Sequence, residues 1–212
     1  MSRVVIPADR DVRGSLDGPE SATALVVACP PHPQFGGDRH DRRLRAVGSA
    51  LTEDTIACCR IDYGPWDEGR GERADVQAAI EWAQSRAAVV GVFGYSFGAS
   101  LAILAAAQAN SGPEKTARKS DLAAVSALAP TATVVDEGDV VRAIDALEPE
   151  PALQVCYGSR DTTVEWEPVA ERATDRGATV LELPADHFFV GQHDAVADRV
   201  AAFFRKTLLD DE

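Results

Sequence analysis

Short apolar runs alternate along the chain with longer segments in which apolar residues recur every three or four positions. The apolar runs, each expected to form a strand, are residues 24–29, 55–61, 88–95, 122–129, 152–157 and 179–183. The segments with helical periodicity are residues 41–51, 72–85, 97–109, 139–147, 166–176 and 194–209. Strands that are apolar throughout are typical of a parallel sheet covered on both faces. The pattern therefore predicts an α/β fold with a doubly wound, mostly parallel sheet and helices on both faces.

The segments outside this alternation add little further structure. Residues 4–6 and 12–16 are candidates for an antiparallel pair of strands at one edge of the sheet. Residues 62–71 are rich in turn-forming residues, and residues 110–121 are polar and predict a surface loop. No internal repeat is present, and no segment is long enough for a lid domain. A length of 212 residues fits one domain over residues 1–212.

The balance of charges narrows the possible partners. The net charge is −13, and of the 21 cationic side chains only Lys115, Lys119 and Lys206 are lysines. An acidic, lysine-poor surface argues against binding to nucleic acid, which requires a basic footprint. It favours a halophilic protein in a salt-rich cytoplasm, where salt screens the repulsion between carboxylates. An ordinary acidic protein encoded by a GC-rich genome is the alternative.

The N-terminal residues and the cysteines bear on the compartment. The first residues lack the apolar core of a signal peptide, and no stretch approaches the roughly 20 apolar residues that span a bilayer. We therefore expect a cytoplasmic protein with no membrane partner. The four cysteines, Cys29, Cys58, Cys59 and Cys156, lie in apolar runs without the spacing of a metal site, so buried reduced thiols and no bound metal are expected.

One five-residue motif carries candidate chemistry. Gly94-Tyr95-Ser96-Phe97-Gly98 fits the pattern G-x-S-x-G, with a predicted strand before it and a predicted helix after it. In this setting the pattern marks a nucleophilic serine on a sharp strand-to-helix turn. Side chains at the two glycines would collide where strand and helix converge, and the helix N-terminus directs amide dipoles toward developing negative charge. We predict that Ser96 is a nucleophile; the alternative is a serine that only caps the helix.

A serine nucleophile requires a base, and the base requires an orienting group. In proteins with this motif the partners follow in the order serine, acid, histidine. His187 directly follows the predicted strand 179–183, at the carboxyl edge where sites of open α/β sheets form, and is the expected base. His193 lies near a predicted helix start and is expected to be solvated or to cap that helix.

The favoured acid is Asp161, which follows the predicted strand 152–157 through a short turn at the same edge of the sheet. The competitors are Asp186, Glu165 and Asp145. Asp186 adjoins the histidine in sequence, and a neighbouring residue seldom orients its partner's ring. We expect it to fix the loop instead.

The oxyanion of an acyl-transfer reaction requires two N–H donors. The first is expected to be the backbone N–H of Phe97, and the second comes from the loop after residues 24–29. Proline has no N–H, which excludes Pro30, Pro31 and Pro33. The remaining candidates in that loop are His32, Gln34 and Phe35, and His32 is favoured by position.

A substrate pocket is predicted from nearby aromatic and loop residues. Its candidate members are Gln34, Phe35, Trp66, Tyr95 and Phe188. Packing in the core is an equal alternative for Trp66, Tyr95 and Phe188. Without a lid, the cleft is expected to be open and shallow and to favour short acyl groups.

Several motifs together resemble a known family. They are His32-Pro33 with Gly36-Gly37, Gly69-Arg70-Gly71-Glu72 before a helix with Asp75 and Trp82, the Ser96 motif, the turn from Gly158 to Asp161, and Asp186-His187-Phe188-Phe189-Val190-Gly191. Over roughly residues 24–204 the chain resembles the small, lidless α/β hydrolases related to dienelactone hydrolase, and particularly their members with a serine nucleophile. The resemblance implies an α/β-hydrolase fold without a lid, a Ser96–Asp161–His187 triad, and ester or thioester hydrolysis. Dienelactone hydrolase itself uses a cysteine nucleophile, so its lactone substrate is not implied.

The predicted function is hydrolysis of a small carboxylic ester with a short acyl group, through an acyl-enzyme on the serine. No metal or organic cofactor is expected. A thioesterase or acyltransferase with the same triad is the first alternative. A non-catalytic binding protein that keeps the fold is the second, because a fold alone does not establish activity. A monomer and a homodimer are both open.

Overall fold

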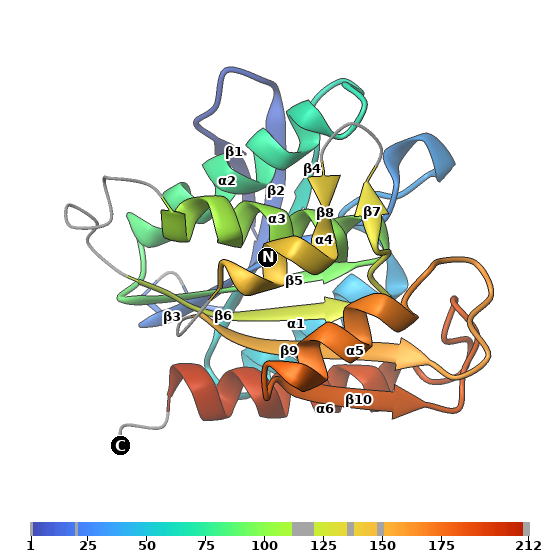
Figure 1. Cartoon of the computed structure of the whole chain (residues 1–212). Coiled ribbons are helices and arrows are strands. Elements are labelled where there is room, and N and C mark those ends of the chain that lie inside the picture. Colours follow the sequence, from blue (N-terminus) through green and yellow to red (C-terminus); the bar gives the residue numbers. More distant parts are fainter. Residues whose placement is uncertain (1, 20, 112–120, 135–137, 148–150, 210–212) are drawn as a thin grey trace.

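A single large sheet organises the described part of the chain. The computed structural model describes residues 2–19, 21–111, 121–134, 138–147 and 151–209. Its eight-stranded sheet has, in spatial order, β1 (Ser2–Ile6), β2 (Val12–Asp17), β4 (Ala57–Asp62), β3 (Ala24–Cys29), β5 (Val89–Tyr95), β6 (Asp121–Leu128), β9 (Ala152–Gly158) and β10 (Thr179–Leu183) (Figure 1). The pairs β1–β2 and β2–β4 are antiparallel, and the pairs from β4 to β10 are parallel. The predicted mostly parallel sheet with an antiparallel edge is confirmed.

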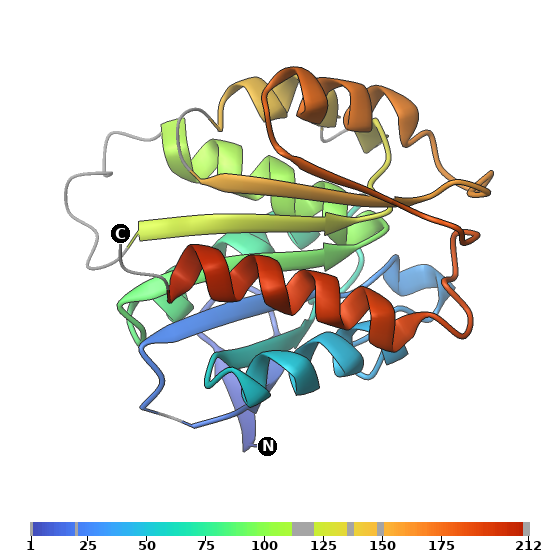
Figure 2. The same ribbon diagram turned by 90° about the horizontal axis from the view of Figure 1, so that it is seen from below.

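Helices cover both faces of the sheet. They are α1 (Arg42–Glu53), α2 (Arg70–Gln84), α3 (Phe97–Ser111), α4 (Val140–Asp145), α5 (Glu167–Asp175) and α6 (His193–Leu208). Figure 2 shows α1 and α6 side by side on one face, with α3 and α5 on the other. Each face buries its own apolar cluster, and the two clusters divide the vicinal cysteines: Cys58 packs on the α1–α6 side and Cys59 on the opposite side. This division follows from the alternation of side chains along a strand.

The predicted strands and helices are all present, with ends within two residues of the expected positions. Three short elements were not predicted: the 3₁₀ helix η1 (Pro33–Phe35) and the two-stranded ribbon of β7 (Thr133–Val134) and β8 (Gly138–Asp139). Elements of two or three residues are too short to produce a periodic pattern. The surface loop predicted at 110–121 falls largely on residues 112–120, which lie outside the described residues.

Two further predictions concern burial. All four cysteines are free and buried, as expected. Within the described ranges, no helix combines the length and the apolar character needed to cross a membrane.

Candidate active site

Ser96 lies on the tight turn between β5 and α3. Its φ of 56° is in the left-handed region, which costs a non-glycine residue about 1–3 kcal/mol and must be held by its surroundings. The turn is held in part by the Ser96 N–H, which donates to the Leu128 carbonyl oxygen of the adjacent strand at 2.8 Å. A strained backbone of this kind is typical of a functional site.

The glycines of the motif are required by close backbone approach. A Cβ added at Gly94 would lie 2.2 Å from the carbonyl oxygen of Gly98. A Cβ added at Gly98 would lie 2.4 Å from the carbonyl oxygens of both Cys29 and Pro30. These contacts are with backbone atoms, which cannot rotate away. The strand, the helix and the loop after β3 therefore converge only because both positions lack a side chain.

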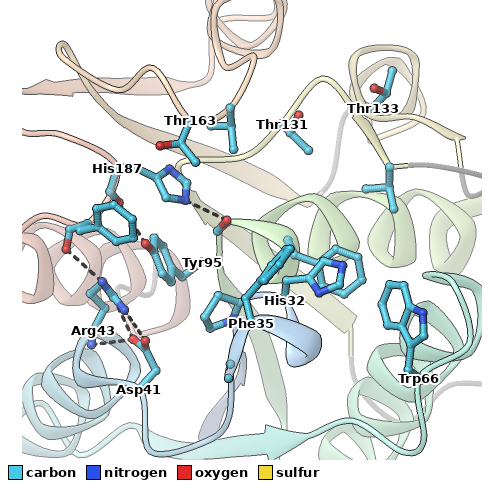
Figure 3. Close-up of a pocket in the computed structure, with 18 of the residues that line it drawn as sticks. His32, Phe35, Asp41, Arg43, Trp66, Tyr95, Thr131, Thr133, Thr163 and His187 are labelled. Carbon is cyan, nitrogen blue, oxygen red and sulfur yellow. Dashed lines mark hydrogen bonds and ion pairs between the residues drawn. The ribbon is translucent and has the colours of Figure 1, made fainter.

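Three side chains from separate strand ends meet at this turn. The Nε2 atom of His187 lies 3.0 Å from the Oγ of Ser96, and its Nδ1 atom lies 2.7 Å from the Oδ2 of Asp161 (Figure 3 draws the first contact). The second carboxylate oxygen, Oδ1, accepts the N–H of Thr163 at 2.8 Å. The Asp161 side chain is fully buried and that of His187 is 6% exposed. The serine, histidine and aspartate predicted from the sequence thus form one continuous hydrogen-bonded line.

The competing acids and the second histidine lie elsewhere. Asp186 is exposed and accepts a hydrogen bond at 3.0 Å from the backbone of its own loop. Glu165 is exposed, and Asp145 pairs on the surface with Arg172 at 2.6 Å. His193 is the first residue of α6 and does not line the cavity beside Ser96. None of these groups contacts the His187 ring.

The backbone around His187 is anchored at two points. The hydroxyl of Tyr95 donates to the carbonyl oxygen of His187 at 3.0 Å, and the guanidinium of Arg43 donates to that of Phe188 at 3.0 Å. The guanidinium also lies 4.2 Å above the Tyr95 ring and pairs with Asp41 at 2.9 Å. Burial raises the pKa of Tyr95 to about 12, although the nearby Arg43 offsets part of this effect, so its hydroxyl stays protonated and donates.

The three candidate amides of the loop after β3 differ in whether they already have an acceptor. In the turn of η1, the Gln34 N–H donates to Nδ1 of His32 at 3.3 Å, and the Phe35 N–H donates to the His32 carbonyl oxygen at 3.1 Å. Of the three candidate amides, only that of His32 has no acceptor within the described chain. Phe97 begins α3, so its N–H also lacks an intrahelical acceptor. Both N–H groups belong to residues that line the cavity at Ser96.

The cavity at Ser96 has a volume of about 860 Å³, within the range of pockets for drug-sized ligands. Of the predicted pocket residues, four line it: Phe188, and Phe35, Trp66 and Tyr95, which are labelled in Figure 3. Gln34 does not: it is the middle residue of η1 and is exposed, because consecutive residues of so short a turn point in different directions. The volume is larger than a short acyl ester needs.

Several residues that line the cavity were missed by sequence reasoning. Asp41 and Arg43 come from the start of α1, and Thr131, Thr133 and Thr163 come from segments after β6 and β9. The threonines follow the carboxyl ends of parallel strands, where sites are expected, so this signal could have found them. No comparable signal marks the start of α1. Among the described residues, no group of three or more His, Cys, Asp or Glu side chains could hold a metal ion.

Solved structures with the same architecture identify the fold. An α/β serine hydrolase without a lid from Xanthomonas campestris is 21% identical, with coverage of 100% of this chain and 96% of that one and a TM-score of 0.79. Est1E from Butyrivibrio proteoclasticus is 16% identical, with coverage of 99% and 100% and a TM-score of 0.80. An esterase from Pyrococcus furiosus is 17% identical, with coverage of 98% and 91% and a TM-score of 0.75.

No family model matches this chain, and no curated protein sequence matches it. Because the solved structures share so few identical residues with this chain, their similarity to it shows a common fold alone. The chain has the α/β-hydrolase fold, and the described residues include no lid, as the sequence predicted.

Proposed function

We propose that this protein is a serine hydrolase that cleaves carboxylic esters through an acyl-enzyme. The observation that carries the proposal is the hydrogen-bonded line from Ser96 through His187 to Asp161, with contacts of 3.0 and 2.7 Å. A base in contact with the nucleophile, itself oriented by a buried carboxylate, is the arrangement that activates a serine hydroxyl. The serine hydrolases and esterases that share the fold support the same class of reaction.

The reaction proceeds in two halves. His187 accepts the hydroxyl proton at Nε2 while the Ser96 oxygen forms a bond to the ester carbonyl carbon. The resulting oxyanion accepts hydrogen bonds from the N–H groups of Phe97 and His32. The carbon–oxygen bond to the alcohol then breaks, and the alcohol leaves with the proton from His187. Water attacks the acyl-enzyme with the same histidine as base, which releases the acid and restores the serine.

The buried Asp161 has two roles in this scheme. It accepts the hydrogen bond from the Nδ1–H of His187, which leaves Nε2 unprotonated and facing the serine. It also stabilises the imidazolium that forms when the serine proton moves. No step of the scheme needs a metal or an organic cofactor.

A panel of oxygen esters and thioesters tests the proposal. We expect the wild type to hydrolyse 4-nitrophenyl acetate, butanoate and octanoate, and Ser96→Ala to lower kcat by about 10⁴- to 10⁶-fold. Ser49→Ala, at an exposed position of α1 outside the cavity, is the matched control and should retain wild-type rates. Turnover confined to acyl-CoA thioesters would make the protein a thioesterase. Absence of turnover on every substrate would favour a binding protein with a hydrolase fold.

A further inference from the structure

Four rings lie together along one side of the cavity. His32 is at the centre, with ring centroids 4.9 Å from Phe35, 4.5 Å from Trp66 and 4.8 Å from Phe97. The Trp66 and Phe97 centroids are 5.9 Å apart. All four residues line the cavity, and we call them the aromatic wall. Figure 3 shows His32 and Trp66 on the side of the cavity away from His187, with Phe35 nearer the middle.

The aromatic wall leaves apolar surface in contact with solvent. Phe35 is 88% exposed and Trp66 is 36% exposed, although large apolar side chains are normally covered. An exposed apolar patch inside a concave site is typical of a binding surface, because a ligand that covers it removes apolar area from water. An aromatic ligand gains more free energy of binding than the burial of apolar area alone provides. A contact between two aromatic rings adds about 0.5–1.5 kcal/mol, or about 2- to 13-fold in affinity.

Hydrogen bonds hold in place the segment that carries Trp66, one member of the aromatic wall. The buried carboxylate of Glu72 accepts the N–H groups of Asp67 at 2.9 Å and Gly69 at 2.8 Å. Arg10 donates to the carbonyl oxygen of the residue before Trp66. Because these contacts fix the segment on both sides of the tryptophan, little conformational entropy is lost when a ligand binds to it.

The charges around the cavity favour an uncharged ring at this side. The Gln34 N–H donates to Nδ1 of His32, and burial lowers the His32 pKa, so this imidazole is neutral near pH 7. Glu68 also lines the cavity and disfavours an anionic substituent. The paired Asp41 and Arg43 lie at the other side of the cavity (Figure 3).

The position of the aromatic wall relative to His187 indicates which half of an ester substrate, acyl or alcohol, the wall would bind. In the proposed reaction the leaving alcohol takes its proton from His187, and the oxyanion faces the amides of Phe97 and His32. The rings of these same two residues belong to the aromatic wall, and in Figure 3 His32 and Trp66 lie across the cavity from His187, so the wall adjoins the oxyanion site. We infer that the aromatic wall binds the acyl half of the substrate, and that this half carries an uncharged aromatic ring; this inference rests on the proposed function.

Two isomeric esters test the inference. The substrate that we expect to be preferred has a non-aromatic leaving group, so its only ring is on the acyl half. Methyl 3-phenylpropanoate carries its ring on the acyl half, and 2-phenylethyl acetate carries it on the alcohol. Acid release in a pH-stat gives kcat/KM for each ester. Each value is divided by the rate at which hydroxide hydrolyses that ester, which corrects for differences in intrinsic reactivity. We expect about a tenfold preference for methyl 3-phenylpropanoate, the upper part of the range for a ring pair. Methyl 3-cyclohexylpropanoate, which carries a saturated six-membered ring in place of the phenyl ring, should be hydrolysed several-fold more slowly than its phenyl counterpart.

Two variants assign the preference to the aromatic wall. Phe35→Leu and Trp66→Leu keep apolar bulk at exposed positions, so folding is preserved, and each should lower the preference at least threefold. Val5→Ala, at an exposed apolar residue of β1 outside the cavity, should leave it unchanged. Equal hydrolysis of both isomers, a preference for 2-phenylethyl acetate, or an unchanged preference in both leucine variants would overturn this inference while ester hydrolysis stands. Failure to hydrolyse any ester, including 4-nitrophenyl acetate, would instead overturn the proposed function.

Discussion

The substitution Asp161→Asn isolates the role of one buried atom. The two carboxylate oxygens have different partners: Oδ1 accepts the Thr163 N–H at 2.8 Å, and Oδ2 faces Nδ1 of His187 at 2.7 Å. An asparagine keeps the shape, and its carbonyl oxygen is held at the Oδ1 position by the Thr163 N–H. Reversing the amide would leave that N–H facing an NH₂ group, at a cost of about 1–3 kcal/mol. The NH₂ group therefore takes the place of Oδ2.

The consequence is a change of tautomer in His187. The new NH₂ group donates to Nδ1, so the imidazole proton moves to Nε2, the atom 3.0 Å from the Oγ of Ser96. A protonated Nε2 cannot accept the serine proton. We expect kcat to fall by about 10⁴-fold, the size of effect known for a misplaced tautomer in a serine triad.

The assay is hydrolysis of 4-nitrophenyl butanoate near pH 7.5, together with urea unfolding to show that the variant is folded. Asp186→Asn is the matched control, because Asp186 adjoins His187 in sequence but bonds only to its own loop in the described structure. It should retain kcat within a few-fold. A kcat for Asp161→Asn above one tenth of wild type, or an equal loss in Asp186→Asn, would refute the tautomer argument.

Three further predictions concern the tight turn at Ser96, the thiols and the surface charge. Gly98→Ala places a Cβ 2.4 Å from the Cys29 and Pro30 carbonyl oxygens, so it should lower the free energy of unfolding by about 1–3 kcal/mol in urea titration; an unchanged midpoint would contradict this. Burial raises the pKa of Cys59 and Cys156 to about 12, so dithionitrobenzoate at pH 8 should react only after unfolding, and rapid reaction of native protein would contradict the buried state. If this protein, with its net charge of −13, is halophilic, its melting temperature should rise as KCl increases. A melting temperature insensitive to molar KCl would contradict the prediction that the protein is halophilic.

Much of the fold could be predicted because its strands are apolar on both faces. The run from Val89 to Phe93 is apolar on both faces of the strand. The helix after it, α3, has no polar stripe because its side chains are largely buried. The meeting of Ser96, Asp161 and His187 follows from the same logic, because parallel strands bring their carboxyl ends to one edge of the sheet.

The remainder of the site depends on packing between distant segments. Arg43 contacts the Phe188 carbonyl oxygen across 145 residues of sequence, and it does so because α1 packs beside α6 on one face of the sheet. No local pattern around Arg43 indicates this contact. Gln34 was predicted to line the pocket and does not line this cavity, because the direction of a side chain in the three-residue helix η1 depends on a turn that has no periodic signal.

Labelling with a fluorophosphonate probe, followed by peptide mass spectrometry, tests the central claim most directly, because the probe reacts only with an activated serine. We predict one label per wild-type chain, on the peptide that contains Ser96, and the same labelling in Ser49→Ala. Ser96→Ala should not be labelled. An unlabelled wild type, or equal labelling of Ser96→Ala, would contradict the claim that Ser96 is the nucleophile.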